Sequence, residues 1–541
     1  MKYFIKQVVS LVCMALIVGT AQASSNSWNV AGSGNWDAST ANWIGDSTTF
    51  TNDGSVDVYF TNAAGGTITI ITNMTPKSTT VSASSGTYVF SGGPIDGTGS
   101  LTKSGAGALT LSSSNSYNGG IILNSGTLTL SNGMAIGTGT LTINGGTLVI
   151  ASSPLVNNNP IMATGSFSLS GGGNPNTGTG TFKLTKPITI SGGGDNADTK
   201  NLGLTIPNVI TDASGGNTLN AFDIYWNIGG TTAAFTLSGA ITLRSNQTIT
   251  VNIPANTSGM NISGNIGDGG NGYGLTLAGT MGTYSLGGRG AALFLRGTNT
   301  YSGDTLINVG TLSIKNNLAL ENSAIDTSGA GAVSLSVTAP TFGGLKGNKD
   351  LTALITSGFS NSVTTLTLNP LEGHTNNYSG VIIDGAAGMK LIKTGAGAQI
   401  LSGTNSYTGV TIVSNGTLLV NGSITGVVTV ATNASFGGTG TVNGNVILSA
   451  GAKAVFTPGF PLTITGSLAL GNNVTAHLKL PDGLQVGTYP LVTFNSSGSS
   501  GSFAQIPVID SGAAFGTPKI VNGSNKVDLV VSGLGTVITI R

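Results

Sequence analysis

Cysteine is nearly absent from the sequence. The one cysteine among 541 residues, Cys13, lies inside an apolar segment close to the N-terminus. Residues 10–12 do not provide the small residue that a lipid-attachment site needs before its cysteine, so we interpret Cys13 as an ordinary hydrophobic residue. Removal of this N-terminal segment leaves no thiol, which excludes disulfides, thiolate metal sites and a cysteine nucleophile.

Charged residues are scarce as well. They make up 7% of the sequence, and the formal net charge is +1. Lysine and arginine form no cluster that would bind a phosphate backbone, so we expect no nucleic-acid partner. The surface polarity must come from serine, threonine and asparagine, whose neutral hydroxyl and amide groups suit a carbohydrate or a neighbouring cell-surface polymer.

Good helix formers and long apolar runs are also missing. Only two glutamates occur, Glu321 and Glu372, whereas glycine and the strand-forming and turn-forming residues dominate. Helix content is therefore expected to be near zero in the mature chain. No segment approaches the roughly 20 uninterrupted apolar residues that a membrane-spanning helix requires, so no transmembrane segment is expected.

The N-terminus has the pattern of a secretory signal peptide. Lys2 and Lys6 precede an apolar run over residues 8–18, and Ala21-Gln22-Ala23 forms a small-x-small cleavage site. We predict a signal peptide over 1–23 and an exported mature protein. Its expected location is extracellular or on the outer cell surface, with the periplasm left open.

The apolar residues are arranged as short strands. Disorder is not expected, because 39% of the residues are hydrophobic and the mean hydropathy is +0.25. Apolar and polar residues alternate in segments that end at glycine or Asn-Gly, which indicates a strand followed by a turn. Examples of these segments are Leu109-Thr110-Leu111, Leu128-Thr129-Leu130, Leu141-Thr142-Ile143 and Leu148-Val149-Ile150.

An internal repeat is visible in the sequence. Residues 101–111 align without a gap with residues 391–401, a third copy covers 293–312, and Asn377-Tyr378-Ser379-Gly380 looks like a fragment of a fourth. Each unit is too small to bury its own apolar face, so we expect the units to stack. We interpret the Asn-x-Tyr pair of each copy as structural, with ligand binding as the alternative. The three pairs are Asn115 and Tyr117, Asn299 and Tyr301, and Asn405 and Tyr407.

The order of these motifs resembles the autotransporter-associated β-strand repeat, also called the passenger-associated transport repeat. The shared pattern is Lys-x-Gly-Ala-Gly, Leu-x-Leu, Asn-x-Tyr-x-Gly and Gly-Thr-Leu. The resemblance is good over 100–130, partial over 285–315 and 390–460, and poor over 150–280. Further similarity lies at the start and towards the end of the chain, in Trp28, Gly34-Asn35-Trp36, Asn42-Trp43, Phe436-Gly437-Gly438-Thr439-Gly440 and Pro458-Gly459.

This resemblance implies an all-β fold, a right-handed parallel β-helix (β-solenoid) with N- and C-terminal caps that cover its exposed sheet edges. We predict an N-terminal cap with the first coils at 24–95, a repeat region at 96–460 and a C-terminal β cap at 461–541. Within the repeat region, 150–280 diverges and is left open between further coils and a lateral insertion. The tryptophans at 28–43 are expected to seal the N-terminal end, with a sugar-stacking platform as the alternative.

The C-terminal part departs from the autotransporter pattern. The residues after Pro458 are too few for a translocating barrel of alternating strands, and they include no apolar segment followed by a basic cluster. We therefore expect a stand-alone secreted form that lacks the translocator barrel, from a diderm bacterium.

No catalytic, cofactor-binding or metal-binding residue is predicted. The two histidines, His374 and His477, are far apart in sequence, which in a solenoid separates them by several coils. Glu372 is close to His374, but no Gly-x-Ser-x-Gly motif occurs near them. These residues therefore give no support for a serine-histidine-acid triad.

Two glycine-rich loops resemble cation sites in part. Residues 268–277 are similar to the calcium-binding nonapeptide, but Gly274 stands where that motif needs an aspartate, so we predict a turn. The loop that carries Asp195 and Asp198 is interpreted as solvated, with a weak site for a hard cation as the alternative.

Three functions remain open. The preferred one is an exported structural or adhesion protein that presents an extended Thr/Asn/Ser-rich surface to glycans or other cells, and the second is a non-catalytic polysaccharide-binding module. The third, a β-helix polysaccharide lyase or hydrolase, needs clustered carboxylates or a cation beside a basic residue. The aspartates are spread along the chain, and Arg244, Arg289 and Arg296 are the only internal arginines, so we do not expect an enzyme. Oligomeric state is left open.

Overall fold

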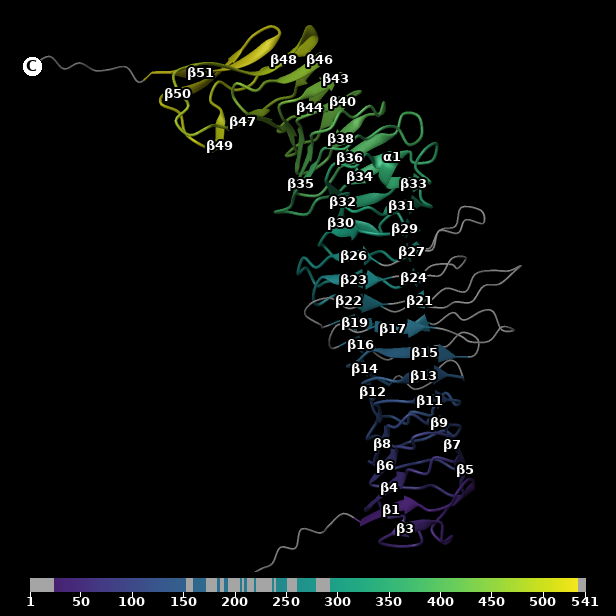
Figure 1. Cartoon of the computed structure of the whole chain (residues 1–541). Coiled ribbons are helices and arrows are strands. Elements are labelled where there is room, and N and C mark those ends of the chain that lie inside the picture. Colours follow the sequence, from purple (N-terminus) through teal and green to yellow (C-terminus); the bar gives the residue numbers. More distant parts are fainter. Residues whose placement is uncertain are drawn as a thin grey trace, which may run out of the picture.

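The protein forms a long, curved column of stacked strands (Figure 1). The single helix within the described part, α1 (Leu351–Leu354), is one turn long. The predicted signal peptide, with Cys13, and the loop of Asp195 and Asp198 lie outside the described residues. The computed structural model describes residues 24–151, 159–171, 182–184, 189–192, 205–206, 209–211, 218–219, 236–237, 240–250, 260–278 and 292–533.

Two parallel sheets build the N-terminal half of the column. Over most of this half their strands alternate along the chain, so that a typical coil contributes one strand to each sheet. The first sheet contains β3 (Trp43–Gly45), β1 (Ser24–Trp28), β4 (Val56–Phe60), β6 (Ser78–Val81), β8 (Ser100–Lys103), β10 (Ile121–Leu123), β12 (Leu141–Ile143), β14 (Ile161–Ala163), β16 (Phe182–Leu184), β19 (Val209–Thr211), β22 (Ile241–Thr242) and β25 (Ile266–Gly267). The second sheet contains β2 (Gly34–Trp36), β5 (Gly65–Ile70), β7 (Thr87–Gly92), β9 (Ala108–Leu111), β11 (Thr127–Leu130), β13 (Thr147–Ile150), β15 (Phe167–Gly171), β17 (Thr189–Gly192) and β20 (Thr218–Leu219).

Three further sheets build the C-terminal half. The third contains β18 (Thr205–Ile206), β21 (Thr236–Leu237), β24 (Met260–Ile262), β27 (Ala292–Leu295), β29 (Thr311–Ile314), β31 (Ala332–Leu335) and β33 (Ile355–Ser357). The fourth contains β23 (Gln247–Thr250), β26 (Leu275–Ala278), β28 (Thr305–Ile307), β30 (Leu320–Asp326), β32 (Thr341–Lys346), β34 (Thr365–Leu368), β36 (Lys390–Lys393), β38 (Thr411–Val413), β40 (Ser423–Thr425), β41 (Val428–Val430), β43 (Thr441–Asn443), β44 (Val446–Leu448), β46 (Leu462–Leu470), β48 (Gly487–Ser500), β51 (Lys526–Ser532) and β50 (Thr517–Asn522). The fifth contains β35 (Thr375–Tyr378), β37 (Ala398–Leu401), β39 (Thr417–Val420), β42 (Ser435–Gly437), β45 (Lys453–Phe456), β47 (Thr475–Lys479) and β49 (Val508–Ser511).

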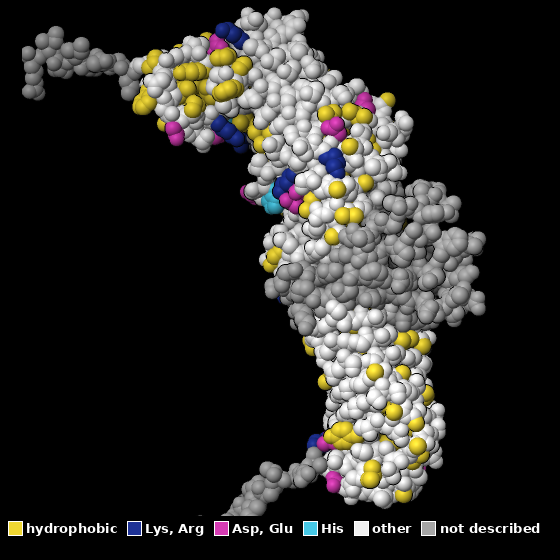
Figure 2. Space-filling model, in the orientation of Figure 1, with side chains coloured by type: hydrophobic (Ala, Val, Ile, Leu, Met, Phe, Trp, Pro, Cys, Tyr) yellow, Lys and Arg dark blue, Asp and Glu magenta, His cyan; other side chains and the backbone are white. Residues whose placement is uncertain are grey.

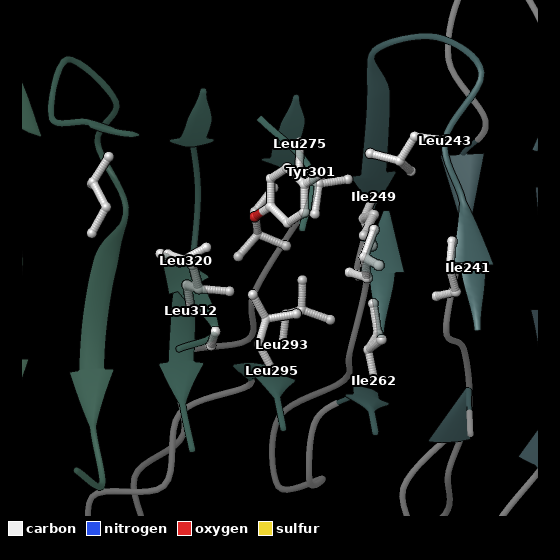
Figure 3. Packing of buried hydrophobic residues seen from close by; sticks show 14 of the residues in the cluster. Ile241, Leu243, Ile249, Ile262, Leu275, Leu293, Leu295, Tyr301, Leu312 and Leu320 are labelled. Atoms are coloured by element: carbon white, nitrogen blue, oxygen red, sulfur yellow. The ribbon is translucent and has the colours of Figure 1, made fainter. Parts of the chain in front are cut away.

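Alternation within each strand creates the core. Leu109 and Leu111 of β9 point inward and are buried, while Thr110 between them faces outward. Figure 3 shows the same arrangement farther along, where Leu293 and Leu312 point into the space between the sheets. Each leucine buried in this way contributes about 1.5–3 kcal/mol of hydrophobic stabilisation. Stacked coils thus share one continuous apolar core, as the repeat predicts.

Three tryptophans close the N-terminal end. β3 runs antiparallel to β1 and ends the stack, and Trp28 pairs there with Trp43. Trp28, Trp36 and Trp43 are at most 3% exposed, and the Trp28 and Trp43 rings meet edge to face at 5.2 Å. A sugar-stacking platform requires exposed rings, so that alternative is wrong for these residues and the sealing role is confirmed.

The C-terminal end changes from parallel to antiparallel pairing. β48 still pairs in parallel with β46, but its other edge pairs antiparallel with β51, which in turn pairs antiparallel with β50. This unit carries exposed apolar side chains, seen in yellow in Figure 2. They are Val486, Ile506, Val508, Ile509, Phe515 and Val521.

The predicted fold class, an all-β parallel β-solenoid with a cap at each end, is confirmed. Within 150–280, the described strands β14, β16, β19 and β22 continue the first sheet. We propose on this basis that the divergent region adds coils to the stack, and the division at 95 and 460 stays a prediction. No helix among the described residues is long and apolar enough to cross a membrane.

Candidate functional site

The lysine of the repeat motif points into the protein. Lys103, at the end of β8, is fully buried, and its Nζ donates hydrogen bonds to the carbonyl oxygens of Ser104, Gly105 and Ser125 at 2.8, 2.9 and 3.0 Å. Burial lowers the pKa of Lys103 to about 8. Its ammonium group thus joins the turn at Ser104 and Gly105 to the turn at Ser125 in the next coil, so this lysine is structural.

The same arrangement recurs in the later repeat copy. Lys393, at the end of β36, donates to the carbonyl oxygens of Thr394, Gly395 and Asn415. The burial of the repeat lysine could have been predicted from the sequence. Leu101 and Lys103 are two residues apart in an alternating strand, so they share the inward face.

A glycine completes each lysine turn. Gly126 has a φ of +70°, and a Cβ at this position would collide with Lys103 Nζ and the carbonyl oxygen of Gly105. Both the backbone conformation and the close approach of the neighbouring coil therefore require glycine. This explains why Gly-Thr-Leu follows Lys-x-Gly-Ala-Gly in the repeat.

The repeat asparagines connect successive coils. The Asn115 Oδ1 accepts a hydrogen bond from Ile95 N at 2.9 Å, and its Nδ2 donates to the Ala135 carbonyl oxygen at 2.8 Å. Ile95 and Ala135 belong to the coils on either side, 20 residues away in sequence in each direction. Asn299 and Asn405 make the corresponding pairs of hydrogen bonds. The structural interpretation of these asparagines is confirmed.

The repeat tyrosines lie in the core. Tyr301 and Tyr407 are buried, and their hydroxyl groups lie 2.6 and 2.7 Å from Thr305 Oγ1 and Thr411 Oγ1. Burial raises the pKa of Tyr301 to about 12 against the smaller opposing effect of its hydroxyl partners. These side chains are therefore unavailable to an external ligand.

The expected fourth fragment occupies a different place in the coil. Tyr378 lies inside strand β35, whereas Tyr117 and Tyr407 lie in connections between strands. Asn376, not Asn377, is the buried amide here, and its Nδ2 donates to the Gly343 carbonyl oxygen at 3.0 Å. Tyr378 is therefore not equivalent to the repeat tyrosines, although the sequence around it is similar.

The loop after β25 is a turn stabilised by Asp268. Its buried carboxylate accepts hydrogen bonds from Gly270 N, Tyr273 N, and the backbone and hydroxyl of Ser302 at 2.8–3.1 Å. Burial raises the pKa of Asp268, but these hydrogen bonds outweigh that effect and the pKa is lowered. The predicted turn is confirmed, and its carboxylate oxygens are occupied by protein donors. Across the described ranges, no three His, Cys, Asp or Glu side chains gather as a metal site.

The two histidines lie on different coils. His374 precedes β35, while His477 lies on β47, five strands away in the fifth sheet. His477 Nδ1 is 2.9 Å from Asp510 Oδ1, and its Nε2 is 3.1 Å from Thr475 Oγ1. Sequence reasoning missed this row because Asp510 is 33 residues from His477. Thr475 and His477 are two residues apart and both lie on the outer face of β47. We therefore interpret the hydrogen-bonded row of Thr475, His477 and Asp510 as a structural contact between β47 and β49.

One long region of the sequence carries no charge. No Asp, Glu, Lys or Arg occurs between Lys103 and Lys183. Figure 2 shows the coils above the N-terminal cap with scattered hydrophobic side chains and an uncharged visible face. On the strands, the outward positions mix threonine with aliphatic residues, as in the aligned row Thr102, Ile122, Thr142 and Met162.

A row of amide and hydroxyl groups runs along the turns of this region. Asn144 Nδ2 donates to Asn124 Oδ1 at 2.7 Å, and the Thr164 hydroxyl donates to Asn144 Oδ1. We call Asn124, Asn144 and Thr164 the neutral ladder. Its members follow one another once per coil, at the roughly 4.8 Å spacing of paired strands. Asn124 and Asn144 are exposed, so the ladder is the candidate binding surface.

Comparisons with known proteins identify the repeat. Residues 101–130, 125–150, 290–314 and 391–420 match the Passenger-associated-transport-repeat family. Three of these matches confirm the predicted copies, and the match at 125–150 is a copy that the sequence analysis missed. No solved structure matches the chain.

One curated relative is an adhesin. A stretch of 72 residues is 40% identical to the "Adhesin BmaC autotransporter" of Brucella suis biovar 1 (strain 1330). The stretch covers 13% of this chain and 2% of that protein, so the similarity concerns a small part of the adhesin.

Proposed function

We propose that this chain, which carries passenger-associated transport repeats, is an exported adhesin-like β-helix protein that binds glycans through the neutral ladder. The observation that carries the proposal is the charge-free region between Lys103 and Lys183, whose turns present Asn124, Asn144 and Thr164 in a row. Sugar hydroxyls need donors and acceptors, and these side chains provide both without net charge.

The similarity of a 72-residue stretch to an adhesin supports this proposal, and so do the passenger-associated transport repeats of this chain. The predicted signal peptide supports export. The internal polar groups of the repeat hold the coils together, so contact with a ligand falls to the outward side chains.

The proposed role is binding without turnover. Asp268 is saturated by four protein donors, and His374 and His477 do not meet. An acid and a base that act together on a glycosidic bond must flank it from one site.

Affinity electrophoresis through gels that contain neutral polysaccharides tests the ladder directly. We expect the mature protein to be retarded by at least one polymer, and a variant with Asn124→Ala, Asn144→Ala and Thr164→Ala to migrate as in an empty gel. The matched control is Asn377→Ala with Ser402→Ala, which removes a similar pair joined at 2.9 Å outside the charge-free region. Equal retardation of the ladder variant and this control would show that the ladder does not bind glycan.

A further inference from the structure

One cluster on the outer face of the third sheet breaks the neutral pattern. Phe294 of β27 faces outward, between the buried Leu293 and Leu295. The Arg296 guanidinium carbon lies 5.8 Å and the Lys315 Nζ 5.3 Å from the centre of the Phe294 ring. We call these three residues the basic-aromatic cluster.

Both cations are held in place by uncharged partners. Arg296 Nε donates to Asn261 Oδ1 at 3.1 Å, and Lys315 Nζ donates to Ser336 Oγ at 2.7 Å. Among the described residues, neither cation forms an ion pair with a carboxylate. The strands of the third sheet contain no acidic residue, so no strand residue of this sheet compensates the positive charge of Arg296 and Lys315.

The two cations also disfavour each other. Burial lowers the pKa of Lys315, and the positive charge of Arg296 lowers it further. Phe294 partly offsets this repulsion, because the face of an aromatic ring attracts cations. An anion placed between Arg296 and Lys315 would remove the repulsion and gain two charge-assisted hydrogen bonds.

Other repeat copies in the chain lack this cluster. The residues on either side of Phe294 and of its counterparts Thr110 and Ile400 are buried, so the difference described here concerns the surface. In the aligned copies, Phe294 corresponds to Thr110 and Ile400, Arg296 to Ser112 and Ser402, and Lys315 to Ser131 and Asn421. Folding of the repeat therefore does not require an aromatic ring or a cation at these positions.

We propose that the basic-aromatic cluster binds an acidic polysaccharide through its carboxylate groups. A carboxylate would lie between Arg296 and Lys315, and the sugar ring would lie on the open sheet face beside Phe294, where Asn261 and Ser336 offer hydrogen-bonding groups. A peptide cannot pair with the backbone here, because both edges of β27 and of β29 are already paired. This inference deepens the proposed glycan binding by assigning a second ligand class to a separate site.

Affinity electrophoresis of the full chain with polygalacturonate tests the site, with methyl-esterified polygalacturonate as the uncharged form of the same polymer. The cluster variant is Arg296→Gln with Lys315→Gln, and the matched control, Lys390→Gln with Lys479→Gln, removes two exposed cations elsewhere. We expect polygalacturonate to retard the wild type and the control, with about ten-fold weaker affinity for the cluster variant. Phe294→Leu is expected to weaken binding as well, and the ester is expected not to retard any of them.

Equal affinity of the cluster and control variants would overturn the site. Equal retardation of the wild type by polyglutamate would overturn the assignment to a polysaccharide. The neutral polysaccharide gels separate this inference from the proposed function: the cluster variant is expected to keep its neutral retardation, whereas the ladder variant is expected to lose it and still bind polygalacturonate. Loss of both kinds of binding in the cluster variant would contradict a separate site.

Discussion

Lys103 and Lys393 occupy the same position in two copies of the repeat, and each ammonium group joins carbonyl oxygens from two successive coils. In both copies the lysine takes the inward position that an aliphatic residue takes elsewhere in the sheets. The stack is therefore held by hydrogen bonds from inside the turns as well as by its apolar core.

Lys393→Met is expected to destabilise the protein. Methionine fills a similar volume but leaves three carbonyl oxygens without their donor, and each unsatisfied buried group costs about 1–3 kcal/mol. The midpoint of urea unfolding should fall. Lys390→Met, on the same strand but exposed, is the matched control and should leave the midpoint nearly unchanged. Equal midpoints for the two variants would show that the buried ammonium group contributes nothing.

The contribution of Lys393 should depend on pH. Burial lowers its pKa from the ordinary value of 10.5 to about 8. Between these pH values the unfolded chain keeps a proton that the folded chain has released, so raising the pH favours the folded state. The stability of the wild type relative to Lys393→Met should therefore rise between about pH 7.5 and about pH 9.5. A relative stability that falls over this range would contradict the lowered pKa.

Above about pH 9.5 the ionisation of buried tyrosines also changes the stability of the protein. Burial raises the pKa of Tyr301 to about 12, so the folded chain keeps a proton there that the unfolded chain loses. Rising pH then favours unfolding. The comparison with Lys393→Met cancels this effect, because both proteins contain Tyr301.

Asn115→Asp is expected to weaken the contact between three coils. The new carboxylate still accepts from Ile95 N, but it cannot donate to the Ala135 carbonyl oxygen, and a buried charge is added. The free energy of unfolding is expected to fall by about 2–4 kcal/mol. Hydrogen exchange at the Ile95 amide should become faster. Asn118→Asp changes an exposed amide in the same turn and should not affect it. Unchanged exchange in Asn115→Asp would contradict the bridging role.

Trp36→Ala is expected to loosen the N-terminal cap. The fully buried ring packs against Trp43, Phe50, Phe60 and Phe90, and loss of a buried tryptophan costs about 3–5 kcal/mol. Circular dichroism should show a lower unfolding temperature, with glycan retardation of the folded variant unchanged. An unchanged unfolding temperature for Trp36→Ala would contradict the sealing role of this ring.

Much of the fold follows from short-range patterns. Alternation in Leu109-Thr110-Leu111 predicts a strand with two buried leucines, and the alignment of 101–111 with 391–401 predicts stacked coils. Both patterns depend on neighbours in sequence and on one repeated unit. The stacking of the coils follows from them, whereas the parallel β-helix was expected from the resemblance of the repeat to a known family.

The surface sites could not be predicted in the same way. Phe294 and Lys315 meet because β27 and β29 are adjacent, and His477 meets Asp510 because β47 and β49 are adjacent. The register of these strands depends on the lengths of the turns between them. Asn376 illustrates the same limit, since only the strand position of β35 shows that this amide, and not Asn377, is buried.

The most direct test of the account is native electrophoresis of the mature protein through gels cast with neutral polysaccharides, followed by staining of the gel for the polymer. We expect retarded migration in at least one gel, with the stained polymer left intact along the path of the protein. A cleared zone at the position of the protein would show turnover and would contradict a non-catalytic adhesin.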